Sequence, residues 1–131
     1  MTKVRSTREQ VRAQSAYVRI EALLSESPAW IKDYGRQSLR LPALIHHCGL
    51  CQALAFLESK SAGEKGEAYR RLLSDLATVS GLGGLASEAR GADIAKYIRM
   101  TQEAIASAEW LKRYAEALGL TEPKKAAQGK K

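Results

Sequence analysis

The residues best suited to chemistry lie together in the motif HHCGLC, which holds every histidine and cysteine of the 131-residue chain. Histidine and cysteine are the usual zinc ligands, but a zinc site needs four of them converging on a tetrahedron. On a helix His47, Cys48 and Cys51 would share one side, whereas His46 would point elsewhere. The chain contains no second pair of ligands, so a zinc site is the weaker interpretation and no metal is expected.

The same motif could be a redox Cys-x-x-Cys pair, which normally begins a helix after a strand, where the helix dipole lowers the thiol pKa. Here the cysteines fall about two turns inside an apolar helical segment with no strand before it. The favoured interpretation is that both cysteines are small core residues and that Gly49 permits a close helix contact. Zinc binding and redox chemistry remain as alternatives.

Other catalytic patterns have little support in this chain. A nucleophile needs a base within hydrogen-bond reach, and both histidines are neighbours on the most apolar segment. Acidic residues stand four positions from arginines, as Glu109 does from Arg113, which is typical of solvated helix surface. The GLGG segment lacks the lysine and the preceding strand of a phosphate-binding loop. We therefore expect a protein that is not an enzyme and has no cofactor.

Arginine placement near the start of the chain is the stronger functional signal. At about 100° per residue, Arg5, Arg8, Arg12 and Arg19 fall within an arc of about 60° and span roughly 20 Å of helix axis. No carboxylate stands four positions from Arg8 or Arg12, so neither is neutralised within its own helix. Such a stripe can follow a phosphate backbone. A solvated basic face without a ligand is the equally weighted alternative.

The net charge of +7 lies entirely at the two ends of the chain. Residues 1–20 carry five basic side chains against one acidic, residues 121–131 carry four against one, and the residues between are balanced. A polyanion such as nucleic acid would meet these ends first. The few aromatic residues fall in the apolar segment or on expected core stripes, so any nucleic-acid contact should be made with the phosphate backbone rather than with bases.

The elements that must position these residues are helices, because no run of β-branched residues alternates with polar ones. The first helix should begin near Thr7, with a capping box formed by Ser6 and Glu9. Its buried stripe should consist of Ala13, Tyr17, Ile20 and Leu24. Further helices are expected over about 29–39, 41–60, 64–80 and 92–118. The helix over 41–60 should be entered through Pro42 and is apolar nearly all round, so it must be surrounded.

The whole chain is therefore predicted to be all-α: a single compact bundle of five or six helices over residues 1–120, followed by a disordered basic tail over 121–131. No stretch of about 18 uninterrupted apolar residues is present, so no membrane-spanning helix is expected. Two cysteines form no secreted disulfide framework, which favours a cytoplasmic protein.

Three segments together resemble one family: RAQSAYVRI, LPALIHHCGLCQALAFLESK and YIRMTQEAIASAEWLKRYAEAL. Their order and spacing are similar to the small helical subunit of the type III-B CRISPR effector, the Cmr RNA-targeting complex, over most of residues 8–118. The most specific pieces are Leu41-Pro42, Gly49-Leu50, Phe56-Leu57 with Ser59-Lys60, and EWLKRYA. The resemblance implies a non-catalytic scaffold subunit for antiviral defence, whose copies stack into a short filament beside the crRNA-bearing backbone.

The partners implied by the resemblance are crRNA, target RNA and the other subunits of the Cmr complex. Lys60, Lys112 and Arg113 lie in the matching segments and are candidate RNA contacts, whereas Arg5, Arg8, Arg12 and Arg19 are candidates from helical geometry alone. The competing hypothesis is a free-standing helical adaptor that binds only proteins and uses its basic surface for solubility.

Overall fold

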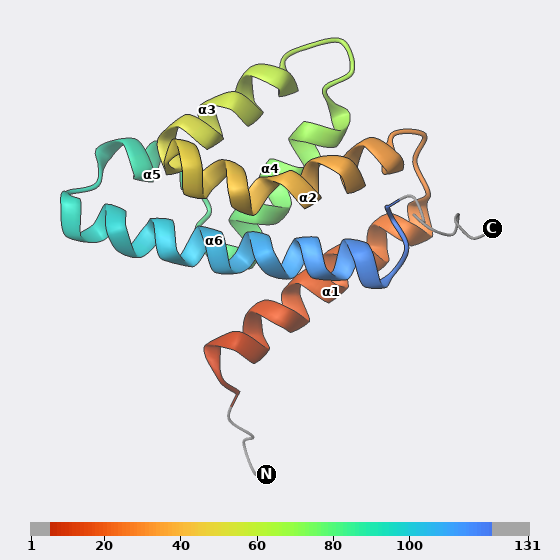
Figure 1. Cartoon of the computed structure of the whole chain (residues 1–131), viewed down its shortest axis with the longest axis horizontal. Helices are drawn as coiled ribbons and strands as arrows, with labels where there is room; N and C mark the ends of the chain where they lie inside the picture. Colours follow the sequence, from red (N-terminus) through yellow and green to blue (C-terminus); the bar gives the residue numbers. More distant parts are fainter. Residues whose placement is uncertain (1–5, 122–131) are drawn as a thin grey trace.

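The protein is described by a computed structural model over residues 6–121, and this part of the chain forms α-helices and no strand (Figure 1). The helices are α1 (Arg8–Glu26), α2 (Ile31–Cys48), α3 (Leu50–Ser61), α4 (Glu67–Ser80), α5 (Leu85–Gly91) and α6 (Ile94–Ala117). The predicted all-α bundle is thereby confirmed. Arg5 and nearly all of the predicted tail lie outside the described residues.

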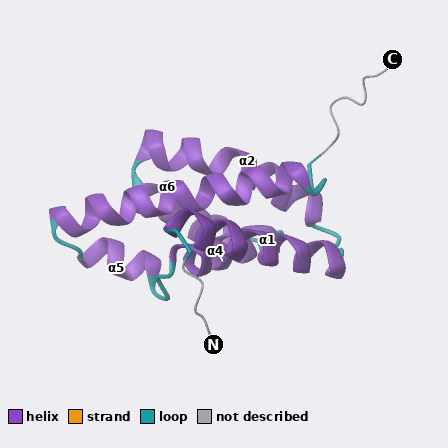
Figure 2. Cartoon of the chain, turned by 90° about the horizontal axis from the view of Figure 1, so that it is seen from below, coloured by secondary structure: helices purple, strands orange, loops and turns teal. Residues whose placement is uncertain are grey.

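The helices pack in two layers. α2 and α6 lie side by side and run in opposite directions, and α1 and α4 lie beneath them (Figures 1 and 2). α3 folds back from the end of α2 onto α4, and α5 closes the bundle against α3. Of the described helices, none is both long and apolar enough to cross a bilayer. This arrangement leaves α1 covered by α6 on one side and by α4 on the other.

The core is built from apolar residues spaced three or four apart, which form one face of each helix. Small residues on α6, such as Ala104 and Ala108, are fully buried and let neighbouring helices approach closely. On α1 the buried residues are Ala16, Ile20 and Leu23. The predicted stripe is correct only at Ile20, because Ala13 and Tyr17 are half-buried and Leu24 is 37% exposed. The buried face of α1 turns toward the groove between its two neighbours instead.

The predicted helix over 41–60 is in fact two helices. α2 runs through Pro42, which removes only one backbone hydrogen bond, and ends at Gly49. Gly49 has φ 89° and ψ 157°, a backbone conformation essentially confined to glycine. Its N–H donates to the Ile45 carbonyl and its carbonyl accepts from the Ala53 N–H, so it closes α2 and starts α3. Gly49 therefore breaks the helix rather than permitting a helix contact.

The α1 cap has the predicted form but lies one residue further along. Thr7, not Ser6, is the capping residue: its hydroxyl accepts from the Gln10 N–H at 3.0 Å, and the Gln10 side chain accepts from the Thr7 N–H at 2.8 Å. This reciprocal pair satisfies two amide donors that would otherwise have no partner in the first turn. α5 was not predicted, because seven residues are too few to show a helical period.

Candidate nucleic-acid interface

The crossing of α1 and α6 is held by a cluster of one carboxylate and two arginines. Glu103 of α6 accepts two hydrogen bonds from Arg12, at 2.8 and 2.7 Å, and one from Arg8, at 2.9 Å. The hydroxyl of Ser107 donates to the same carboxylate at 3.3 Å. The two arginines differ in exposure: the Arg12 side chain is 19% exposed and that of Arg8 is 81% exposed.

These contacts set the charge of the cluster. The hydrogen bonds from Arg12 hold the pKa of Glu103 far below its usual 4.5, at about 2, and Arg8 lowers it further, while burial opposes them. Glu103 is therefore ionised at neutral pH. One carboxylate between two guanidinium groups leaves the crossing with an excess positive charge.

Arg19 occupies a different, buried cluster where α1 meets α4. It donates to Asp75 at 2.9 Å, and Asp75 also accepts from the Tyr34 hydroxyl at 2.5 Å and from Arg71 at 3.4 Å. Asp75 is fully buried. Burial, and then the charge of Asp75, raise the pKa of Tyr34 well above its ordinary value, so this phenol stays a donor. A carboxylate buried with three donors fixes the position of α1, α2 and α4.

The expected stripe of unpaired arginines is therefore wrong for Arg8, Arg12 and Arg19. Their acidic partners come from α6 and α4, far away in the sequence, where inspection of positions four residues apart cannot find them. Arg12 and Arg19 hold the fold together. Arg8 is paired but largely solvent-accessible.

The remaining predicted contacts do not form one patch. Lys112 and Arg113 lie on α6, but at about 100° per residue they point to different sides of it. Lys60 lies at the end of α3, where its ammonium stands 5.6 Å from the centre of the Phe56 ring. α3 packs against α2, α4 and α5, so Lys60 lies across the bundle from α1 (Figure 1).

Sequence reasoning missed Arg99. It is exposed on α6 one turn before Glu103, and about 40° around the helix from Arg113. Within the described residues neither arginine forms an ion pair. Glu103, which holds Arg8, lies between them along the α6 axis, about 6 Å from Arg99 and about 15 Å from Arg113. We call Arg8, Arg99 and Arg113 the basic edge. The wheel of the last predicted helix would have revealed two of its three members.

Three aromatic rings lie on the α1–α6 crossing beside the basic edge. Tyr17 and Tyr114 meet edge to face at 5.4 Å between ring centroids, and Trp110 stacks on Tyr114 at 5.6 Å. The two tyrosines line a surface hollow of about 540 Å³. All three rings are half-buried, so Tyr17 is not the core residue that the sequence predicted. Because each ring packs on another, the cluster stiffens the crossing.

The HHCGLC motif lies mostly at the surface. Cys48 is exposed and Cys51 is half-buried, so the prediction of two core cysteines is wrong. The helix break at Gly49 is the reason, because it separates the two cysteines onto different helices. His46 and His47 are exposed and lie edge to face. Across residues 6–121 no three histidine, cysteine or acidic side chains gather in a group that could hold a metal ion.

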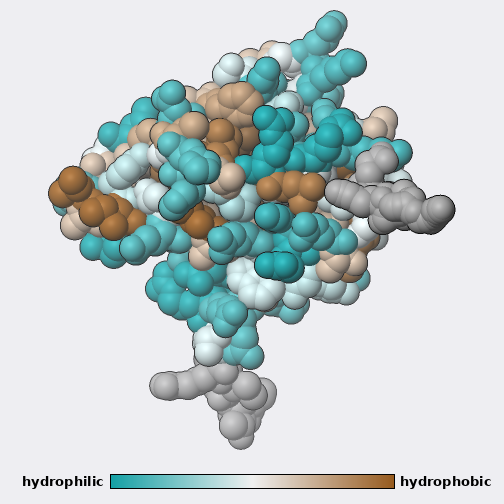
Figure 3. All heavy atoms as spheres, viewed as in Figure 1, coloured by the Kyte–Doolittle hydropathy of each residue, from teal (hydrophilic) through white to brown (hydrophobic). Residues whose placement is uncertain are grey.

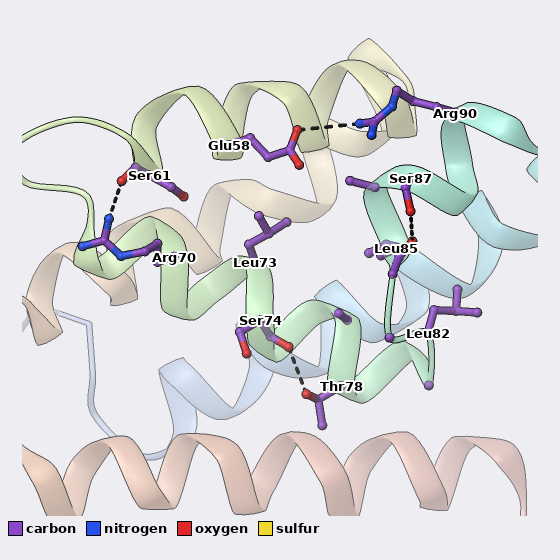
Figure 4. Close-up of a pocket in the computed structure, with 15 residues that line it drawn as sticks. Glu58, Ser61, Arg70, Leu73, Ser74, Thr78, Leu82, Leu85, Ser87 and Arg90 are labelled. Carbon is purple, nitrogen blue, oxygen red and sulfur yellow. Dashed lines mark hydrogen bonds and ion pairs between the residues drawn. The ribbon is translucent and has the colours of Figure 1, made fainter.

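A larger groove, of about 790 Å³, opens between α3, α4 and α5 (Figure 4). Three of its hydroxyl groups donate to backbone carbonyls: Ser61 to Leu57, Thr78 to Ser74 and Ser87 to Gly84. Glu58 and Arg90 face one another across it at 4.0 Å. The residues lining the groove include no histidine, so it holds no pair of nucleophile and imidazole base.

Apolar side chains remain uncovered in two separate places. Along the outer side of α1, Val11 is 57% and Val18 is 47% exposed. At the start of α6, Ile94 is 78% and Ile98 is 51% exposed, and apolar atoms gather at that end of the molecule in Figure 3. Large exposed apolar side chains that cluster in this way are typical of contact surfaces.

Comparison with known proteins gives one consistent result. The family model of a CRISPR-associated protein, Cas_Cmr5, matches residues 8–118. A CRISPR system Cmr subunit, Cmr5, from Thermus thermophilus is 44% identical over 116 residues, which cover 86% of this chain and 96% of the relative. The crystal structure of a CRISPR-associated Cmr5 family protein from the same organism superposes with a TM-score of 0.78 at 41% identity, over 88% of this chain and 99% of the other.

Proposed function

Because this chain belongs to the Cas_Cmr5 family of CRISPR-associated proteins, we propose that it is a non-catalytic scaffold subunit of a cytoplasmic Cmr complex. In this role it stacks beside the crRNA-bearing backbone of the complex, contacts the phosphates of crRNA or target RNA, and serves RNA-guided antiviral defence. Its protein partners are the other subunits of that complex, as the name of the Thermus relative suggests.

The observation that carries the RNA contact is the basic edge. Arg99 and Arg113 are exposed on one side of α6 without a carboxylate partner among the described residues, and the exposed Arg8 is held by Glu103, which lies between them along the helix. Their positions along the axis allow one strand to meet several guanidinium groups in turn, each releasing counterions. Lys112 and Lys60 stay candidates for separate contacts, on another side of α6 and at the end of α3.

The uncovered apolar side chains support self-association. The patch on α1 and the patch at the start of α6 are different surfaces, and a contact between unlike surfaces of two copies repeats in one direction. Such a contact builds a short filament rather than a closed dimer. Stacked copies would also place their basic edges in a row.

The test is the salt dependence of RNA binding. We expect the full chain to bind single-stranded and duplex RNA, with affinity falling steeply between about 50 and 200 mM salt. The pair Arg99→Glu with Arg113→Glu should weaken binding to both RNAs about equally and flatten the salt dependence. Replacing Arg8 and Arg12 together would be a poor test, because a glutamate at position 12 would face Glu103 and loosen the fold.

The matched control is Arg40→Glu with Lys65→Glu, which makes the same change of charge with exposed residues that are neither in the basic edge nor among the other candidate contacts. An equal loss of affinity in the control pair would show that binding follows net charge alone, and would contradict the assignment of the contact to the basic edge. The adaptor hypothesis predicts that the chain has no affinity for either RNA, even at low salt. It also predicts that complexes that co-purify with the chain contain no RNA.

A further inference from the structure

We propose that the Glu103 carboxylate binds Arg8 at the α1–α6 crossing where an RNA phosphate would otherwise bind it. When RNA binds, a phosphate replaces Glu103 as the partner of Arg8, while Arg12 stays bound to Glu103. This inference rests on the proposed function and assigns the two arginines different roles. Arg12 is a positioning residue, whereas Arg8 contacts the RNA backbone. Glu103 then sets how readily the chain binds RNA.

Arg12 is held too firmly to be exchanged. It meets the carboxylate through two nitrogens, Nε at 2.8 Å and Nη2 at 2.7 Å, which is the bidentate geometry of strong arginine–carboxylate pairs. Its side chain is 19% exposed, and Glu103 is 14% exposed. A phosphate would have to enter the interface between two helices to replace this contact.

Arg8 is held by a single hydrogen bond at 2.9 Å, from Nη2, and its side chain is 81% exposed. It lies in the first turn of α1, where its guanidinium group is already turned toward one negative charge. An exposed ion pair of this kind has little net strength, because solvent screens it. A polyphosphate offers Arg8 the same charge-assisted contact together with the release of counterions.

The exchange leaves no buried polar atom without a partner. After Arg8 moves, Glu103 still accepts both hydrogen bonds from Arg12 and the one from Ser107. The α1–α6 crossing therefore stays intact while Arg8 is released. Arg99 and Arg113 carry no such internal competitor within the described residues, so Glu103 weakens one member of the basic edge only.

The experiment compares Glu103→Gln, Arg8→Ala and the double variant in the full chain, with a uridine single strand and an RNA duplex as probes. Arg8→Ala should lower the slope of log affinity against log salt by about 0.7 to 0.9, the share of one phosphate contact, and leave the melting temperature nearly unchanged. Glu103→Gln should raise affinity about two- to five-fold, as expected when an ion pair to an exposed arginine is weakened. In the Arg8→Ala background that gain should disappear.

Arg12→Ala is the comparison variant. It should lower the melting temperature, but the fraction that remains folded should bind RNA with the same slope of log affinity against log salt as the unaltered chain. The inference is overturned if Arg8→Ala leaves the slope unchanged, or if Glu103→Gln raises affinity equally with and without Arg8. If either of these results is found, but the Arg99→Glu, Arg113→Glu pair still binds RNA more weakly than the unaltered chain, the inference about Glu103 fails and the proposed function stands. If the unaltered chain binds neither RNA, both fail.

Discussion

At the scale of single residues, two carboxylates decide what the arginines of α1 can do. Asp75 is fully buried with three donors, so Arg19 is committed to the core. Glu103 is shared between Arg12, which is mostly covered, and Arg8, which is mostly exposed. Arginine therefore stabilises the fold at two positions and faces solvent at a third, according to how far its side chain is covered where it meets the acid.

Acid stability should report the Glu103 contacts directly. The folded pKa of about 2 lies below the ordinary 4.5, so between these values the unfolded chain binds more protons than the folded one. The stabilisation is complete above about pH 4.5 and is lost as the pH falls toward 2. The difference in unfolding free energy between the unaltered chain and Glu103→Gln, measured by urea titration, should therefore shrink below pH 4.5.

Glu109→Gln is the control, because Glu109 is an exposed glutamate of the same helix. It should change the free energy of unfolding little at pH 3 or at pH 7. If the difference in unfolding free energy between the unaltered chain and Glu103→Gln is the same at these two pH values, the lowered pKa of Glu103 is contradicted.

At the scale of elements, the break between α2 and α3 shapes this part of the bundle. Gly49 ends one helix and begins the next, and the Tyr97 hydroxyl of α6 accepts a hydrogen bond from the Cys51 N–H at 3.0 Å. This contact satisfies one of the amide donors at the start of α3 and ties it to α6. The apolar faces of α2 and α3 can then cover different parts of the core.

Gly49→Ala should destabilise the fold by about 1 to 3 kcal/mol, because φ +89° with ψ 157° strains any residue with a Cβ. Steric clash is not the reason, since the nearest atom to a new Cβ would be the Tyr97 hydroxyl at 3.8 Å. Thermal or urea unfolding measures the loss. Gly91→Ala is the matched control. Gly91 is the last residue of α5 and a Cβ added there would meet no other atom within 4 Å, so the substitution should be neutral or slightly stabilising. Equal losses in both variants would refute the argument.

At the scale of the whole molecule, the bundle separates its surfaces by chemistry. The basic edge follows α6, and apolar side chains are left uncovered on α1 and at the start of α6, the second of which is visible in Figure 3. Such a division suits the proposed scaffold role, in which one surface would meet RNA while others meet protein. Apolar area left in water favours association.

Self-association should depend on the start of α6. Ile94→Glu with Ile98→Glu places two charges in the exposed apolar patch and should abolish any concentration-dependent rise in sedimentation coefficient measured by analytical ultracentrifugation. Ala95→Glu with Gln102→Glu adds the same charge to exposed positions of the same helix and should preserve the rise. If the apolar pair associates like the unaltered chain, the contact between copies lies elsewhere.

The all-α class, the approximate positions of most helices and the family could be predicted from the amino-acid sequence, because these follow from local periodicity, capping residues and the order of short motifs. The high arginine content of α1 was also evident there. Which arginines are available depends on the folded chain, since Glu103 lies 95 positions from Arg8 and Asp75 lies 56 from Arg19. Charge compensation acts through space over a few ångströms, and helix packing, not sequence distance, sets which charges come that close.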